Sequence, residues 1–382
     1  MKLTVIGGCG SRSLMLAKCL AQHAEDLDIT DVVFMDIDKE RVRVFGSMVR
    51  EVFSRIAPYV QYLCTTNEKE AVMEADFVIT TIRAGKEESR IIDERVALKN
   101  GVIGQETTGV GGFAMALRSI PTLTYYCRLI GEYSNPNVMV FNFTNPAGLV
   151  TQALRNQGYS FVYGICDAPS GFLRQVAALY DLEYSDLKVQ LIGLNHLSYF
   201  TSVKKDGREI LSEILKDSRL YEHTDMRYFE PKLAQHIGCM LNEYLYYFYY
   251  REKALRNIQK IGETRGERIK KINDHMLKEL GQYDAARDFD KMLEIWNFTV
   301  RCDICIRSAI SLYSRPSHTS RRTSISLAVS SELSARPSFT LGVLSGKICS
   351  PAIVSSITSI SFSGLISLYQ KLSAPASLAR LR

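Results

Sequence analysis

The N-terminal segment constrains the fold more than any other, because an apolar run there leads directly into a cluster of glycines. Leu3–Ile6 has the pattern of a short buried strand, and Gly7, Gly8, Gly10 and Ser11 follow it. Glycines in this place let the backbone approach a pyrophosphate, and the start of the next helix then faces the phosphate charge. The chain is therefore predicted to open with a dinucleotide-binding fold, with these four residues at the cofactor.

The glycine spacing departs from the usual G-x-G-x-x-G pattern. Counted from Gly7, Cys9 stands where the second glycine belongs; counted from Gly8, Ser13 takes the third place. A second apolar run, 32–35, ends in Asp36, which is where such folds bind the diol of the adenosine ribose. This acid favours a nucleotide site, and a tight turn without a ligand stays open as the alternative.

Apolar runs alternate with helical patterns along the first half of the chain. A helical pattern covers 13–24, and further short strands are predicted at 77–81, 138–143 and 161–165. Strands that alternate with helices favour an α/β fold, a Rossmann-like doubly wound parallel sheet.

The character of the sequence changes near residue 190. Strand-like segments at 191–193 and 199–203 flank His196, and 233–250 reads as one long, tyrosine-rich helix, followed by polar helix at 251–280. This half is predicted to form a second, α+β substrate domain, so that the whole resembles lactate and malate dehydrogenases in architecture.

The C-terminal part differs in composition from the rest. Residues 301–382 contain 21 serines and ten Lys or Arg against two acids, whereas residues 1–300 contain 37 basic and 39 acidic groups. We therefore divide the chain into a nucleotide-binding domain at 1–190, an incomplete substrate and metal domain at 191–295, and an atypical basic tail at 296–382. A natural Ser-rich extension and a shift of reading frame are the two explanations of that tail.

Composition also excludes some partners. The body has no basic stripe of the kind that binds nucleic acid, and no run of about 18 apolar residues that would predict a membrane span. The nine cysteines are scattered and odd in number, which is more typical of a reducing cytoplasm than of a disulfide framework.

Cys166 and His196 are the candidate metal ligands. A thiolate and an imidazole suit a borderline divalent ion, and two protein ligands leave coordination positions for substrate and water. Asp167 and Asn145 are polar residues in nearby motifs. A buried structural cysteine and a hydrogen-bonded core histidine form the alternative interpretation.

Tyr244 and two arginines complete the candidates. A tyrosine acts as a base only where a cation lowers its pKa, and a row of tyrosines on a helix is more often core packing. Arg83 follows the predicted strand at 77–81, and Arg265 lies in a polar helix. Arginines can bind phosphate through two hydrogen bonds, although most arginines of polar helices are simply solvated.

Taken together, these segments resemble glycoside hydrolase family 4, the NAD- and metal-dependent phospho-glycosidases. The resemblance covers residues 1 to about 290. Its most specific stretch is 103–114, Ile-Gly-Gln-Glu-Thr-Thr-Gly-Val-Gly-Gly-Phe-Ala, followed by Ala-Leu-Arg at 116–118, and the segments 143–148, 193–198 and 244–247 agree in order and spacing. The family is an NAD-dependent exception among glycosidases that otherwise use two carboxylates.

The resemblance implies a role for each candidate residue. Cys166 and His196 match the ligands of Mn²⁺ or another divalent metal, and Tyr244 matches the catalytic base. Asp167 falls where some members have an acid that assists the leaving group. The remaining matches are to substrate-binding residues near the metal and the phosphate, at Arg83, Asn145, Asn195 and Arg265.

The resemblance also implies a mechanism. NAD⁺ takes a hydride from C3 of the sugar, the metal polarises the ketone, the tyrosine removes the C2 proton, and the group at C1 is eliminated before water adds. The substrate would be a phosphorylated disaccharide or glucoside, with the 6-phospho-β-glucosidase branch favoured, and the protein would act in cytoplasmic carbohydrate metabolism.

Two alternatives qualify these implications. A dehydrogenase acting on 2-hydroxy acids would share the nucleotide fold. An inactive NAD-binding remnant would result if the tail has replaced the usual C-terminal sequence, since the Arg-Gly-Gly and Asn-Asn-Gly segments of the family do not follow residue 295 here. With an intact C-terminal region, a homodimer or homotetramer is expected.

Overall fold

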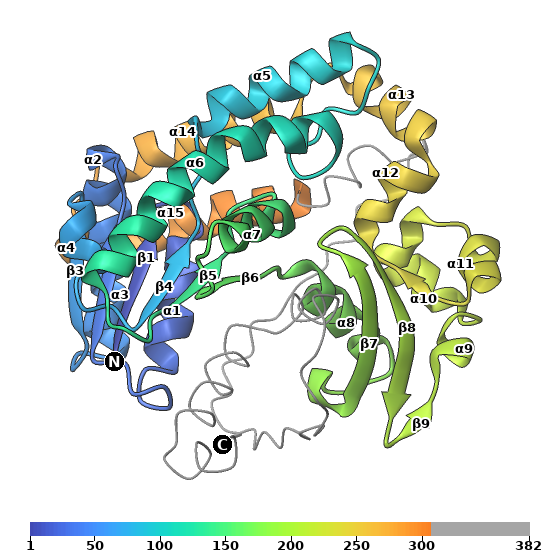
Figure 1. Cartoon of the computed structure of the whole chain (residues 1–382), viewed down its shortest axis with the longest axis horizontal. Helices are drawn as coiled ribbons and strands as arrows, with labels where there is room; N and C mark the ends of the chain where they lie inside the picture. The colour runs from blue at the N-terminus through green and yellow to red at the C-terminus, as the bar shows by residue number, and fades with distance from the viewer. Residues whose placement is uncertain (307–382) are drawn as a thin grey trace.

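The computed structural model describes residues 1–306, and it describes side chains as far as residue 300. Figure 1 shows a parallel sheet with helices on both sides, and a separate antiparallel sheet that lies beside it. None of the helices in this part of the chain combines the length and the apolar character needed to traverse a bilayer.

The first sheet has six parallel strands in the order β3-β2-β1-β4-β5-β6. Their bounds are β1 Lys2–Ile6, β2 Asp31–Met35, β3 Gln61–Thr65, β4 Phe77–Thr80, β5 Met139–Asn142 and β6 Val162–Gly164. The order reverses between β1 and β4, which makes the carboxyl end of these two strands the topological switch point where ligands of such sheets bind. The predicted doubly wound parallel sheet is confirmed.

Helices cover both faces of this sheet because alternate strand residues point to opposite sides. Leu3 and Val5 point to one face, where they pack against α1 (Ser13–Gln22), α3 (Ser47–Ile56) and α15 (Ala285–Ile306). Ile6 and Val33 point to the other face, against α4 (Glu68–Val72), α6 (Gly109–Tyr133) and α7 (Ala147–Asn156). Alternation at a period of two therefore supplies two apolar cores from one set of strands.

The second sheet is antiparallel and belongs to the predicted α+β region. Its order is β10-β8-β7, with β9 paired to β8, and its bounds are β7 Leu187–Leu194, β8 Leu197–Lys205, β9 Arg208–Glu209 and β10 Met240–Leu241. Helix α8 (Ala168–Leu179) packs against this sheet, because Phe172 and Phe200 meet edge to face in one core.

Short elements connect these parts. They are α2 Lys39–Arg41, η1 Val42–Gly46, η2 Tyr184–Asp186, α9 Leu211–Ile214, α10 Ser218–His223, η3 Asp225–Tyr228, α11 Pro231–Ile237, η4 Glu243–Leu245 and α12 Tyr246–Tyr249. Longer helices then carry the chain back to the first sheet (Figure 1): α13 Arg251–Ile261, α14 Arg265–Leu280 and α15, with α14 alongside α5 (Lys86–Lys99).

The division into three domains stays a prediction, but the packing shows which segments share each apolar core. Helix α8 shares a core with the second sheet, whereas Met276 and Trp296 share a core with the first sheet. Each of the two cores therefore includes residues that the predicted division assigns to a different domain. The predicted tail from 296 lies largely outside the described residues.

The single long helix predicted at 233–250 is wrong. Helix α11 ends at Ile237 because Gly238 adopts a left-handed conformation with φ 75°, a common helix terminator. The chain then pairs Met240 with Phe200 of β8. Non-local strand pairing has thus replaced helix in the middle of a segment whose local pattern is helical.

Candidate functional site

The structure brings the two predicted metal ligands together. Cys166 follows β6 and precedes α8, while His196 lies in the tight turn between β7 and β8. The Cys166 Sγ and the His196 Nε2 are 3.6 Å apart. Two residues that are thirty positions apart in sequence therefore face each other, one after the last strand of the parallel sheet and one in a turn of the antiparallel sheet.

The backbone at His196 is strained. Its φ is 134°, a conformation that favours glycine, and its N–H donates to the Leu194 carbonyl oxygen at 2.6 Å. Gly193 precedes the turn with φ 117°, and a Cβ there would lie 2.3 Å from the Leu197 carbonyl oxygen. Strain of this kind persists where surrounding structure holds it, often at functional sites. Here it points the imidazole at the thiol.

The imidazole of His196 is buried but not satisfied. Its Nδ1 has no hydrogen-bond partner among the described residues, although His196 is only 5 % exposed. Burial lowers the pKa of His196 to about 4, so the ring is neutral at neutral pH. A core histidine with both ring nitrogens hydrogen-bonded would show a partner at Nδ1 as well as at Nε2, whereas a neutral imidazole beside a thiol has the form that binds a metal.

Tyr244 adds the third member of this cluster. Its ring stacks on that of His196, with centroids 3.9 Å apart and planes 3° apart. Burial raises the pKa of Tyr244 far above its ordinary value, and Glu243, Glu106 and Cys166 raise it further. Groups that become negative thus gather around the tyrosine, an arrangement that a cation between them would stabilise.

The residues present fit a divalent cation with two protein ligands. No group of three or more His, Cys, Asp or Glu side chains gathers around a common point in the described part of the chain. A thiolate and an imidazole alone leave the remaining coordination positions open, as a cation that also binds substrate requires.

Two further candidates stand beside the thiol. Burial raises the pKa of Cys166, while the Ala168 N–H and the Asn195 side chain lower it. Asp167 is the residue before α8, and its carboxyl raises the pKa of Cys166 and of Glu243. The structure therefore places Asp167 and Asn195 beside Cys166.

Asn145 and Arg83 both bind Glu106, which was not predicted as a site residue. The Asn145 side-chain amide donates to Glu106 Oε1 at 3.4 Å, and the Arg83 guanidinium pairs with Glu106 Oε2. Arg90 Nη1 pairs with the same oxygen at 2.5 Å. Burial raises the pKa of Glu106, but Arg83 and Arg90 outweigh it and hold that pKa at about 2. Glu106 is thus a carboxylate clamped between two guanidinium groups.

The network extends to the start of α14, where Arg265 lies. Arg90 Nε donates to Glu94 Oε1 at 2.7 Å, and Glu94 Oε2 accepts from the Gly266 N–H at 2.7 Å. A Cβ at Gly266 would approach Glu94 Oε2 to 3.0 Å. Arg265 itself is 8 % exposed, so the interpretation as a solvated helix arginine is wrong.

The glycine loop has the geometry of a close backbone approach. The N–H groups of Gly7 and Gly8 both donate to the Met35 carbonyl oxygen at 2.9 Å. A Cβ at Gly7, where φ is 79°, would lie 2.8 Å from the Thr81 carbonyl oxygen, whereas one at Gly10 would meet nothing. The loop therefore needs Gly7 for its conformation and leaves Gly10 open to a ligand.

Asp36 and Ser11 flank this loop. The Asp36 carboxylate accepts from the N–H of Cys9 at 3.4 Å and from that of Asp38 at 3.1 Å. The Ser11 carbonyl oxygen accepts from Trp296 Nε1 at 2.7 Å, which ties the loop to α15. The predicted nucleotide residues thus share the carboxyl edge of β1 and β2.

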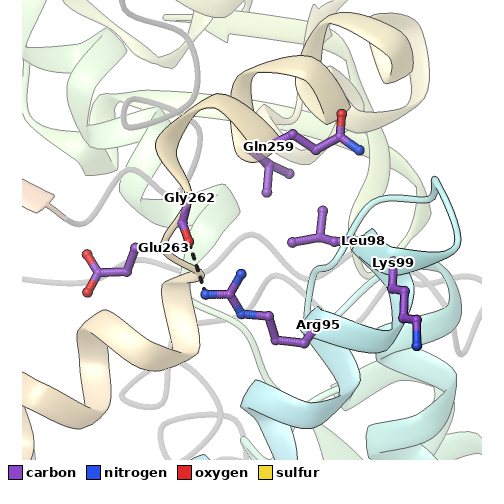
Figure 2. A pocket seen from close by; sticks show the side chains of 7 residues that line it. Arg95, Leu98, Lys99, Gln259, Gly262 and Glu263 are labelled. Atoms are coloured by element: carbon purple, nitrogen blue, oxygen red, sulfur yellow. Dashed lines mark hydrogen bonds between the residues drawn. The ribbon is translucent and has the colours of Figure 1, made fainter.

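A hollow of about 400 Å³ lies elsewhere, between the end of α5 and the turn from α13 to α14. Figure 2 shows Arg95 reaching towards Gly262, whose carbonyl oxygen accepts from Arg95 Nη2 at 3.0 Å. None of the predicted site residues lines this hollow.

Models of two protein domains match the sequence of the chain. The profile of the family 4 glycosyl hydrolases matches residues 2–182, and that of the family 4 glycosyl hydrolase C-terminal domain matches residues 191–329. The chain belongs to glycosyl hydrolase family 4. The second match continues past residue 296, where the atypical tail is predicted to begin.

Relatives in family 4 agree with this assignment. The chain is 31% identical over 281 residues to the 6-phospho-beta-glucosidase BglT of Thermotoga maritima, a match that covers 73% of this chain and 66% of that protein. The structure of the Thermotoga 6-phospho-beta glucosidase with manganese, NAD⁺ and glucose-6-phosphate matches with a TM-score of 0.68 and 31% identity, over 74% of this chain and 68% of that one.

A 6-phospho-alpha-glucosidase from gut microorganisms, solved with NAD and Mn²⁺, matches with a TM-score of 0.65 and 25% identity, over 80% of this chain and 69% of that one. Both anomeric classes therefore occur among the family 4 relatives. The chain spans 66% and 63% of the lengths of two curated relatives, from Thermotoga maritima and Bacillus subtilis.

Proposed function

We propose that this family 4 protein hydrolyses 6-phospho-glucosides, with β-glucosides favoured, and uses NAD and a divalent metal such as Mn²⁺. One observation carries the proposal: Cys166 Sγ lies 3.6 Å from His196 Nε2, and Tyr244 is stacked on that imidazole. A soft ligand pair next to a potential base supports metal-assisted proton abstraction.

Cys166 and His196 would hold the cation, and the chain's own residues would do the rest. Oxidation at C3 by a bound nicotinamide and polarisation of the resulting carbonyl by a bound divalent cation are the chemistry that these groups supply. Tyr244 is half-buried and its ring is stacked on His196, so its hydroxyl would be held in place to accept the proton from C2 of the sugar.

The charge around Tyr244 gives this role a physical condition. Neighbouring acids and the Cys166 thiol raise the pKa of Tyr244 together with burial. A hydroxyl in this setting loses its proton only when positive charge is added beside it. The proposal therefore requires the cation for the base to function, and not only for the substrate to bind.

The remaining polar residues would bind the substrate. Asp167 is placed to protonate the leaving-group oxygen, and Asn145 and Asn195 to orient sugar hydroxyls. In the network around Glu106, the side chain of Arg83 is 29% exposed. Together with Arg265, it would bind the 6-phosphate.

The nucleotide would lie on the glycine loop. Gly7, Gly8, Gly10 and Ser11 would face the pyrophosphate, and Asp36 would bind the ribose diol. The open space around Gly10 and the position of the loop at the switch point of the sheet support this placement.

The test is turnover of a nitrophenyl 6-phospho-β-glucoside by the full chain with NAD⁺, Mn²⁺ and a thiol reductant. We expect release of nitrophenol without net NADH, because the hydride returns to the sugar in each cycle. The 6-phospho-α-glucoside serves as the matched control for the anomer. Sustained accumulation of NADH would indicate a dehydrogenase instead, and no turnover at high enzyme concentration would contradict activity of this chain.

We also propose that the protein acts in the cytoplasm and, with an intact C-terminal region, forms a homodimer or homotetramer. Val110, Phe113 and Leu117 are 54%, 59% and 59% exposed along one side of α6, an apolar row that a second copy could cover. The free Cys166 thiol suits a reducing compartment. Light scattering would give the mass in solution, and a monomer would contradict the oligomer. Labelling of intact cells by an impermeant maleimide would contradict the compartment.

A further inference from the structure

A second pair of thiols meets at the glycine loop, far along the sheet from the metal pair. Cys9 Sγ and Cys64 Sγ are 3.4 Å apart. Cys9 stands in the loop after β1, and Cys64 belongs to the edge strand β3, with β2 between them. The loop therefore reaches across the end of β2 to touch the third strand.

The pair adjoins the predicted ribose acid. The Cys9 N–H donates to Asp36 Oδ2 at 3.4 Å, and Gly8, the preceding residue, packs so closely that a Cβ there would lie 2.9 Å from the Phe34 ring. The Cys9 side chain is fully buried, while Cys64 is partly exposed. A movement of Cys9 would thus be felt at the loop backbone and at Asp36 together.

The two thiols differ in proton affinity. The hydrogen bond from Cys9 lowers the pKa of Cys64, and Tyr62 lowers it further against burial. The same contact, with burial, raises the pKa of Cys9. By contrast, burial alone raises the pKa of Cys127 to about 12. Cys64 is thus suited to attack as a thiolate, and Cys9 to follow as the resolving thiol.

We propose that Cys9 and Cys64 form a reversible disulfide that weakens dinucleotide binding by the glycine loop. This inference rests on the proposed function, because it assumes that the loop binds the dinucleotide. The modification makes the nucleotide site sensitive to the thiol–disulfide balance of its surroundings, through two residues that take no part in the metal site.

The oxidant is a low-molecular-weight disulfide such as oxidised glutathione. The Cys64 thiolate attacks one of its sulfurs, forms a mixed disulfide and releases one thiolate. The Cys9 thiol gives its proton to that thiolate and attacks Cys64 Sγ, which releases the second thiolate. Two protein thiols are oxidised to one disulfide, and one small disulfide is reduced to two thiols.

Closure of the bond changes the loop. An S–S bond is about 2.05 Å long, so the sulfurs approach by about 1.4 Å. The loop backbone at Cys9 is drawn towards β3 and against Asp36, away from the position in which its glycines approach a pyrophosphate. We expect the Kd for NAD⁺ to rise about tenfold, which corresponds to about 1.4 kcal/mol.

The experiment uses the full chain and reads the bond and the affinity separately. Protein treated with oxidised glutathione is digested and analysed by mass spectrometry, and NAD⁺ binding is measured by calorimetry before oxidation, after it, and after dithiothreitol. We expect a cross-linked Cys9–Cys64 peptide, weaker binding, and full recovery on reduction.

Two variants make the test specific. Cys64→Ser keeps Cys9 in the loop and is expected to bind NAD⁺ equally before and after oxidation, whereas Cys19→Ser, at an exposed thiol on α1, is expected to respond as the wild type does. Circular dichroism checks that both variants fold. The comparison of wild-type protein before and after oxidation does not depend on either variant. Absence of the cross-linked peptide, or its formation without a change in Kd, overturns the inference alone. Failure of the reduced wild type to bind NAD⁺ overturns the nucleotide proposal and the inference with it.

Discussion

Two buried polar clusters lie next to each other in this molecule, and they are completed by different means. In the network around Glu106, every charge has an opposite charge within the chain: Arg83 and Arg90 pair with Glu106, and Arg90 also pairs with Glu94. Around Cys166 and His196, the imidazole Nδ1 has no partner among the described residues, and burial together with neighbouring acids and the Cys166 thiol raises the pKa of Tyr244.

The difference between the clusters separates scaffold from site. The Glu106 network joins a strand end, α5 and the start of α14, and it lowers the pKa of its own carboxylate, so it stabilises itself. The cluster around His196 raises the pKa of Tyr244 and keeps a strained turn, so we propose that it is incomplete without an added cation. The charges of the first cluster are therefore paired within the chain, whereas we propose that the second cluster takes a cation from solution.

The largest expected effect is on chemistry at the incomplete cluster. Tyr244→Phe removes only the hydroxyl and keeps the ring on His196, so we expect kcat for the 6-phospho-glucoside to fall by about 10⁴-fold with Mn²⁺ affinity unchanged. Steady-state kinetics and metal titration measure the two quantities. The matched control is Tyr249→Phe in α12, which directly follows the short helix that contains Tyr244. It removes a hydroxyl that contacts the hydroxyl of Tyr199. Equal activity of Tyr244→Phe and the control would remove Tyr244 from the mechanism.

The next effect is on stability at the complete cluster. Glu106→Gln leaves the buried guanidinium of Arg90 and the partly exposed one of Arg83 facing a neutral amide, which we expect to cost about 3–5 kcal/mol in unfolding free energy. Urea denaturation measures it. Glu213→Gln breaks the exposed pair with Arg208 and should cost under about 1 kcal/mol. Similar losses in the two variants would show that the Glu106 network is not the scaffold we describe.

Metal binding should stabilise the fold only through the incomplete cluster. With Mn²⁺ at about 100 times its Kd, linkage predicts a gain of about 2.7 kcal/mol in unfolding free energy. Cys166→Ala should lose this gain, while Cys127→Ala, another cysteine of the buried core, should keep it. A gain that survives in Cys166→Ala would place the metal elsewhere.

The smallest effect is a dependence on pH. The pKa of Glu106 is held at about 2, below its ordinary value, so its stabilising charge is present above that ordinary value and is lost as the pH falls towards 2. The difference in unfolding free energy between wild type and Glu106→Gln should therefore shrink between about pH 6 and about pH 3. A constant difference would mean that the charge of Glu106 does not matter.

The parallel sheet could be predicted from sequence because its signals are local. Leu3 and Val5 alternate with residues of the opposite face, and the runs 32–35 and 77–79 are fully apolar. Strand β3 was missed because it is a half-exposed edge strand, Gln61–Thr65, whose apolar run is short and not buried. The helix predicted across Gly238 failed because β10 is set by pairing with β8, which no local pattern records.

The site was predictable to the extent that its residues stand in motifs. Cys166 and His196 were found by type and by resemblance to the family, and the structure places them in contact. Glu106 lies within the most specific stretch, but its role depends on Arg83 and Arg90, which are brought to it by tertiary structure. Ion pairing between distant segments, like the contact of Cys9 with Cys64, has no signature in a single sequence.

The central claim is that Cys166 and His196 together bind a divalent cation, and Co²⁺ tests it most directly. Co²⁺ bound to a thiolate has a charge-transfer absorption in the near ultraviolet that Co²⁺ bound to nitrogen and oxygen alone does not show. We expect one equivalent of Co²⁺ to give this band in the full chain, with the band lost in Cys166→Ser and Co²⁺ affinity reduced in His196→Ala. An unchanged band in Cys166→Ser, or no band in the wild type, would contradict the account.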